Sequence, residues 1–207
     1  MPPASDYAIF LLAGLTLLVI PGPAVLYIVG QSIDGGRRVG LVSVLGITTG
    51  TLVHVTAAAA GLSALLVSSA VAFDAVRYAG AAYLIVIGLL RLARRTEQEP
   101  VDVRPLHDLR RAYTRGIVVN VLNPKTALFF LAFLPQFVDA SRGHAWLQIV
   151  VLGLSFATLG MLSDGAYAVV AGTVAGRLRG SRGFELVQRW IPGSLFMGLG
   201  VFAAART

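Results

Sequence analysis

The chain of 207 residues contains no cysteine and few charged residues. Without cysteine it forms no disulfide, binds no metal through thiolates and carries out no thiol redox chemistry. Charged residues make up 13% of the chain, against about 25% in soluble domains, whereas apolar residues make up 56% even without glycine. This composition excludes an ordinary soluble domain and predicts an all-α integral membrane protein.

Long apolar stretches predict six transmembrane helices within one domain, residues 1–207. A membrane span needs about 20 apolar residues, because a helix rises about 1.5 Å per residue and the hydrocarbon core is about 30 Å thick. The expected spans are 7–33, 39–66, 70–92, 115–138, 146–175 and 186–205. The last span is the weakest, so five spans and a docked helix remain an alternative.

The arginines predict how the chain is oriented. Segments 34–38, 91–115 and 176–190 hold thirteen arginines, whereas the segments on the opposite side hold three. By the positive-inside rule the arginine-rich segments face the cytoplasm, so both termini are expected outside. The net charge of +7 is therefore a topology signal, and we expect no nucleic-acid partner.

Two prolines interrupt the first expected span. The apolar residues 7–20 reach only about 21 Å, so the helix crosses only by continuing past Pro21-Gly22-Pro23. Proline lacks the backbone N–H and restricts the residue before it, so the helix is kinked or broken there. A broken helix inside a bundle is a device by which transporters build polar sites, although kinks without ligands are also common.

A second interruption, at Asn123-Pro124, falls in the fourth expected span. We therefore expect two halves with broken first helices, residues 1–92 and 115–207, joined by a cytoplasmic hinge loop at 93–114. Each half has three spans, which is an odd number, so two similar halves lie inverted in the membrane.

Small residues recur at intervals of four on the second and fifth spans. Gly46, Gly50 and His54 share one face of the second span, and Gly160 and Asp164 share one face of the fifth. Such rows let helices approach closely, so His54 and Asp164 are expected to face the bundle interior. Asp164 is the one acidic residue deep within an expected span, and a buried carboxylate is a functional candidate by default. Because burial favours its neutral form, it is a candidate proton carrier; the alternatives are a simple ion pair or a helix cap.

Other polar residues in the expected spans are candidates for substrate binding. Lys125, the only lysine, either binds a carboxylate or extends to the cytoplasmic interface. Asn120 and Asn123 need hydrogen-bond partners, so at least one is expected to line a cavity or to bind backbone at the break. His54 serves as well in packing as in binding, and Tyr167 is more often a core aromatic than a ligand.

Motifs for enzyme and metal chemistry are missing from the sequence. No Gly-x-Ser-x-Gly elbow surrounds a serine, no phosphate-binding loop occurs, and the three histidines do not have metal-ligand spacing. We therefore expect neither an enzyme nor a cofactor or metal site.

The order of these motifs resembles the LysE/RhtB family of amino-acid exporters, within the LysE superfamily, over nearly the whole chain. The residues that carry the resemblance in the first half are Pro21-Gly22-Pro23, Gly35-Gly36-Arg37-Arg38, Gly40, Gly46, Gly50, His54 and Gly61. In the second half they are Gly116, Asn120, Asn123-Pro124-Lys125, Phe129 and Pro135-Gln136-Phe137-Val138.

The resemblance implies efflux of amino acids or close derivatives across the bacterial inner membrane, driven by proton antiport. Ala24 and Thr51 depart from the family's pattern, since a polar and an acidic residue are frequent there. The departures favour a neutral or hydrophobic amino acid and leave Asp164 as the proton carrier.

We expect alternating access between the two halves, with the substrate bound at the midplane. Backbone amides near Gly22 and at 123–125 are expected to hold its carboxylate, and carbonyls near Pro21 its ammonium. The complete set of expected substrate-binding residues is Pro21, Gly22, Pro23, His54, Asn120, Asn123, Pro124, Lys125 and Tyr167.

Two other functions compete with amino-acid export. A metal-ion exporter of the same superfamily predicts more intramembrane carboxylates or histidines than Asp164 and His54. A non-transporting scaffold that assembles through its small-residue faces predicts no reason to bury these two residues beside broken helices. The same glycine faces also allow a homodimer.

Overall fold

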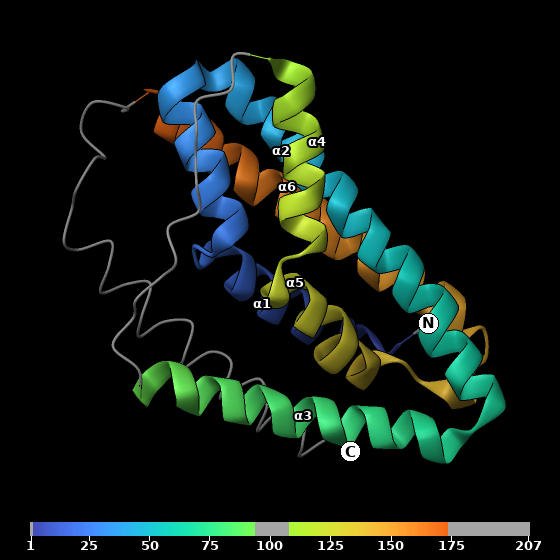
Figure 1. The fold of residues 1–207 in the computed structure, drawn as a ribbon. Helices are drawn as coiled ribbons and strands as arrows, with labels where there is room; N and C mark the ends of the chain where they lie inside the picture. The colour runs from blue at the N-terminus through green and yellow to red at the C-terminus, as the bar shows by residue number, and fades with distance from the viewer. Residues whose placement is uncertain (1, 94–107, 174–207) are drawn as a thin grey trace.

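The computed structural model describes residues 2–93 and 108–173, and every regular element within them is helical (Figure 1). The helices are α1 (Ala4–Val19), α2 (Pro23–Ser68), α3 (Ala70–Ala93), α4 (Leu109–Val121), α5 (Pro124–Leu128) and α6 (Ala145–Thr173). A π-helical turn, Phe129–Phe133, and two 3-10 turns, Leu134–Phe137 and Ala140–Arg142, lie between α5 and α6. The expected span 186–205 lies outside the described residues.

Two of these helices are long and apolar enough to cross a membrane. They are Pro23–Ala64 of α2 and Ala145–Thr173. Leu109–Val121 and Pro124–Phe137, bent by 46° relative to each other, pass the same test together and form either one broken span or a re-entrant loop. The described part of the chain is thus that of an all-α membrane protein. The arrangement as six spans in two inverted repeats remains a prediction.

The expected connection at 34–38 is present as a sharp corner in place of a longer loop, because α2, Pro23–Ser68, consists of two helical parts that meet at Gly36. Only Gly36 leaves the helical conformation, with φ 79° and ψ 175°. Glycine reaches positive φ without a Cβ clash, so a single residue turns the chain between the two helical parts. In Figure 1 this corner lies at the top, where the blue part of α2 meets its cyan part.

The helix of the fourth expected span begins before residue 115, within the segment 93–114 expected as the hinge loop. α4 starts at Leu109 because Asp108 caps it, accepting a hydrogen bond from the N–H of Arg110 at 2.9 Å. A carboxylate at this position satisfies one of the free N–H groups of the first turn. Asp108 is therefore the cap of a helix, and Arg110 and Arg111 lie in its first turn.

The rows of small residues let α2 approach both α4 and α6. A Cβ on Gly50 would lie 2.8 Å from the Cβ of Asn120, and one on Gly153 would lie 2.8 Å from Val55. The sequence-based prediction that these faces pack against neighbouring helices is confirmed at those positions. Gly61, expected near the same face, is instead exposed, and a Cβ added there would have no neighbouring atom within 4 Å.

Six phenylalanines form the centre of the larger apolar core, and we call them the phenylalanine cluster. None is more than 3% exposed. The rings of Phe129 and Phe156 stack with centroids 4.0 Å apart, and Phe10 contacts Phe137 edge to face at 5.3 Å. The members are Phe10, Phe129, Phe130, Phe133, Phe137 and Phe156.

Candidate functional site

Two helix breaks lie next to each other in the structure. The first break, residues 20–22, separates α1 from α2, and the second break, residues 122–123, separates α4 from α5. The side chain of Lys125, just after the second break, donates a hydrogen bond to the carbonyl of Ile20 in the first at 2.6 Å. In Figure 1 the labels of α1 and α5 lie close together near the centre of the picture.

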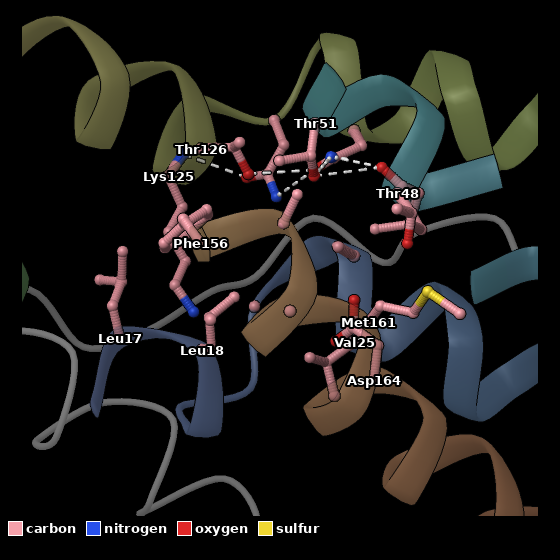
Figure 2. Close-up of a pocket in the computed structure, with 17 residues that line it drawn as sticks. Leu17, Leu18, Val25, Thr48, Thr51, Lys125, Thr126, Phe156, Met161 and Asp164 are labelled. Atoms are coloured by element: carbon pink, nitrogen blue, oxygen red, sulfur yellow. Dashed lines mark hydrogen bonds between the residues drawn. The ribbon is translucent and has the colours of Figure 1, made fainter. Parts of the chain in front are cut away.

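A small cavity lined by both polar and apolar residues lies between the breaks (Figure 2). The space in it that the centre of a water molecule can occupy is about 30 Å³, which is room for about two waters. Binding a molecule as large as an amino acid therefore requires its walls to move apart. The cavity is lined by Leu17, Leu18, Gly22, Ala24, Val25, Ile47, Thr48, Thr51, Asn120, Asn123, Lys125, Thr126, Phe156, Ala157, Gly160, Met161 and Asp164.

Five of the residues expected at the site from the sequence line this cavity. They are Gly22, Asn120, Asn123, Lys125 and Asp164. They come from both breaks and from α6, so the fold brings together side chains that are up to 142 positions apart in the numbering, from 22 to 164.

The other five expected residues do not line the cavity. Pro23 and Pro124 are the first residues of α2 and α5, where a missing N–H costs nothing, and Pro21 is buried inside the first break. These prolines shape the breaks. His54 and Tyr167 contact the breaks from neighbouring helices.

Asn120, at the end of α4, is the most heavily hydrogen-bonded side chain of the site. It is 1% exposed. Its amide nitrogen donates to the carbonyl of Ile47 at 2.7 Å and to the hydroxyl of Thr51 at 2.8 Å. Its amide oxygen accepts hydrogen bonds from Thr126 at 3.0 Å and from Asn123 at 3.5 Å. Both faces of the amide are thus used to tie α2, α4 and α5 together.

His54 holds the backbone of the second break. Its Nε2 lies 3.1 Å from the carbonyl oxygen of Asn120, and its ring stacks on Phe130 with centroids 5.8 Å apart. That carbonyl lies in the last turn of α4 and also accepts the backbone N–H of Asn123 at 3.0 Å. His54 therefore packs on Phe130 and contacts the end of α4 in this structure, and its role in substrate binding stays a prediction.

Lys125 turns inward, so the alternative that it extends to the membrane interface is wrong. Asn123 caps α5 by accepting the backbone N–H of Lys125 at 3.0 Å. The lysine side chain then crosses to the first break, where it passes within 3.2 Å of the Cβ position of Gly22. A side chain on Gly22 would therefore obstruct the path of the lysine.

Tyr167 completes the contacts of the first break. Its hydroxyl donates to the carbonyl of Val19, the last residue of α1, at 2.6 Å. The carbonyls of Val19 and Ile20 are therefore both bound by side chains from the second half of the chain. The sequence-based expectation that these carbonyls hold a substrate ammonium is not met in this conformation.

Asp164 is buried on the inward face of α6, 5% exposed. Within the part of the chain that the structure describes, its carboxylate accepts no hydrogen bond, and the Lys125 ammonium acts on it electrostatically. Gly22, Ala24 and Val25 also line the cavity, so the N-terminal end of α2, with its free N–H groups, borders the same space. The cavity thus combines one acidic residue, Asp164, one basic residue, Lys125, and the positive N-terminal end of α2.

Three threonines of the site were not expected from the sequence as site residues. Thr48, Thr51 and Thr126 line the cavity. Thr48 and Thr51 are three positions apart on α2, the spacing that places two side chains on one helix face. That spacing, beside the row of small residues, is the signal that points to them; Thr51 was noted only for departing from the family's acidic residue.

The fold and the cavity define an all-helical membrane protein with a polar internal site between two broken helices. The family model of the LysE type translocator matches residues 15–207. The chain therefore belongs to the LysE type translocator family and is a transport protein, not an enzyme.

Individual relatives match along almost their whole length. A homoserine/homoserine lactone efflux protein of Salmonella typhi is 29% identical over 95% of this chain and 94% of its own. The protein of the same description from Salmonella typhimurium has the same identity and coverage. An uncharacterized membrane protein of Vibrio cholerae is 28% identical, over 94% of each chain. No solved structure matches the chain.

Proposed function

We propose that the protein exports a neutral amino acid or a close derivative from the bacterial cytoplasm in exchange for protons. The observation that carries the proposal is the cavity between the two breaks, in which Asp164 and Lys125 lie beside the N-terminal end of α2. An acid and a base at one site complement the ammonium and carboxylate that every amino acid carries. The relatives described as homoserine efflux proteins support the same substrate class.

The contacts suggest how such a substrate is held. Its carboxylate pairs with Lys125 and the free N–H groups at the start of α2, since helix N-termini bind anions. Its ammonium pairs with Asp164, because the carbonyls of Val19 and Ile20 are already bound by Tyr167 and Lys125. An ammonium on Asp164 is stabilised only while the carboxylate is charged.

Competition between the proton and the substrate ammonium for Asp164 couples the movement of protons to the export of substrate. A proton that binds the carboxylate removes the partner of the substrate ammonium and so favours its release; loss of the proton allows the next substrate to bind. Since each ligand binds one state of the carboxylate, each shifts the equilibrium between inward-open and outward-open forms by its own differential affinity. Alternating occupation of one acid gives antiport without a second site.

Counterflow in proteoliposomes tests the proposal. Purified protein in vesicles loaded with unlabelled homoserine should accumulate labelled homoserine, and an imposed pH gradient should increase the accumulation. Asp164→Asn should lose the response to the gradient and at least about tenfold in uptake, since a hydrogen bond to a charged group contributes about 1.5–3 kcal/mol.

Asp139→Asn is the matched control. Asp139 precedes α6, does not line the cavity, and pairs with Ser141 and Arg142 at the surface. Its variant should keep the gradient response. If Asp164→Asn kept it too, the proton role of Asp164 would be disproved while export itself would stand.

The competing functions are less well supported. Among the residues that the structure describes, no group of three or more histidine, cysteine, aspartate or glutamate side chains lies close enough to hold a metal ion. The cavity itself offers one carboxylate and an ammonium, and a cation such as Lys125 repels metal ions. A pure scaffold is disfavoured by membership of a translocator family.

The proposal includes the arrangement in the membrane. We place the chain in the inner membrane as six spans in two inverted halves, with both termini outside, because the arginine-rich segments face the cytoplasm. A homodimer through exposed small-residue faces is compatible with this arrangement. Accessibility labelling of single cysteines introduced at residues 2 and 108, in a chain that has no cysteine of its own, would test the orientation.

A further inference from the structure

We infer that Thr48 reads the side chain of the transported amino acid and selects one that carries a hydroxyl. The inference rests on the proposed function, since it assigns a role to the same cavity. It concerns specificity, whereas Asp164 and Lys125 hold the groups that all amino acids share.

The hydroxyl of Thr48 is the first observation. On the same helix, the hydroxyls of Thr49, Thr51 and Thr56 each donate to the carbonyl four residues earlier, at 3.0, 3.3 and 2.9 Å. The Thr48 hydroxyl makes no hydrogen bond within the described part of the chain. Thr48 lines the cavity, so its hydroxyl is open to a ligand there.

The second observation is that the other neutral polar groups of the cavity are already engaged. Asn120 binds Thr51, Thr126 and Asn123 through its amide, and Asn123 also caps α5. Of the polar side chains lining the described cavity, only those of Thr48 and Asp164 make no hydrogen bond to the protein. A ligand hydroxyl that enters the cavity therefore finds its neutral partner at Thr48.

The third observation is the layout of the cavity. Figure 2 draws Lys125 at one end and Thr48 at the other, with Asp164 on α6 below. Val25 and Met161 provide apolar wall in the part of the cavity near Thr48. A substrate whose charged groups are held by Lys125 and Asp164 thus directs its side chain along this wall, and the end of that side chain meets Thr48.

The chemistry of a hydroxyl explains why this contact discriminates. A threonine hydroxyl donates one hydrogen bond and accepts others, so it pairs with a substrate hydroxyl in either direction. A substrate with a methyl group in its place leaves Thr48 without a partner in a site with room for few waters, which is disfavoured. A hydroxyl-bearing side chain is therefore bound in preference to an aliphatic one of equal length.

Homoserine and norvaline form a matched pair of substrates for the test, because norvaline has a methyl group where homoserine has its hydroxyl. Counterflow of each labelled compound gives KM and maximal rate for the wild-type protein. We expect KM for homoserine to be about tenfold lower than for norvaline, the ratio that corresponds to about 1.4 kcal/mol.

Thr48→Val keeps the shape of the side chain and removes its hydroxyl. The variant should lose the preference through a raised KM for homoserine, with KM for norvaline unchanged or lower. Thr49→Val is the control, since the Thr49 hydroxyl binds the carbonyl of Leu45 and the hydroxyl of Tyr113 and does not line the cavity. Thr48→Ser retains a hydroxyl and should retain the preference, so a loss caused by misfolding would be recognised.

Each other outcome would overturn the inference. A wild-type protein that transports both compounds equally well, or a Thr48→Val variant that keeps the preference, would show that Thr48 does not read the side chain, while export itself would stand. If neither compound nor any other amino acid exchanged with folded protein, the proposed function would fail, and the inference with it.

Discussion

The two helix breaks differ in what holds them. The carbonyls of the first break are bound by long side chains from distant parts of the sequence, Lys125 to Ile20 and Tyr167 to Val19. The second break is held by hydrogen bonds between neutral groups around Asn120. The side-chain amide of Asn120 binds the carbonyl of Ile47 and the hydroxyls of Thr51 and Thr126, and these groups lie where α2, α4 and α5 pack together.

This difference indicates which of the two breaks is able to change its conformation. A lysine ammonium that holds a carbonyl also has a carboxylate nearby, Asp164, and a substrate carboxylate offers it another partner. The amide of Asn120 has no such alternative, because all its donors and acceptors are used. We therefore expect the first break to move during transport and the second to stay fixed.

The largest loss of stability is expected from substitutions at the second break. Asn120→Leu removes four hydrogen bonds of the side chain, and hydrogen bonds between membrane helices contribute about 0.6–1.7 kcal/mol each. We expect a loss of about 2–4 kcal/mol of stability, seen as a lower midpoint of thermal unfolding in detergent. Asn123→Ala, which removes a helix cap, should cost about 1 kcal/mol. Equal midpoints for Asn120→Leu and wild type would disprove a structural role for this amide.

Substitutions at the first break should lower the transport rate more than they lower the stability of the protein. Lys125→Met keeps the length of the side chain and removes its charge, so Ile20 loses its partner and the substrate carboxylate loses its cation. We expect counterflow to fall at least about tenfold, with the unfolding midpoint closer to wild type than that of Asn120→Leu. Lys125→Arg should recover part of the rate. A Lys125→Met protein as unstable as Asn120→Leu would remove the distinction between the two breaks.

The smallest effect is expected from Tyr167→Phe. The variant loses only the hydroxyl that binds Val19, which corresponds to about 0.6 kcal/mol, or a change of about threefold in transport rate. Tyr7→Phe is a sharp control, since the Tyr7 hydroxyl also joins α1 to α6, through Ser155 at 2.6 Å, but away from the breaks. Rates that fall alike in both variants would indicate general loosening of α1 in place of a specific role for the first break.

Much of the fold follows from local chemistry that the sequence displays. Prolines mark both breaks, and the structure confirms that the helices are interrupted there. The expected spans 70–92 and 146–175 correspond to helices Ala70–Ala93 and Ala145–Thr173. Glycine rows predicted which helix faces pack, because close approach excludes any larger side chain.

The remainder depends on contacts that no local pattern contains. The corner at Gly36 replaced a loop because one positive φ is enough to turn the chain. The direction of Lys125 is set by a carbonyl 105 positions away, whereas the sequence left two directions open. The role of Thr48 could not be predicted from the sequence, because it depends on the hydrogen bonds in the structure. The hydroxyls of Thr49 and Thr51 donate to the helix backbone, whereas that of Thr48 does not.

The phenylalanine cluster has a consequence for the energetics of the cell. Phe156 forms part of the cavity wall, and its ring also stacks on Phe129 and contacts Phe130 edge to face. Aromatic carbon offers no hydrogen bond to a file of water molecules, so protons have no path through these rings. If water reached the site of a transporter from both sides of the membrane at once, protons would leak through it and dissipate the membrane potential. On the proposed function, we expect the cluster to prevent the site from being open to water on both sides at once, so that protons cross only when the protein changes conformation.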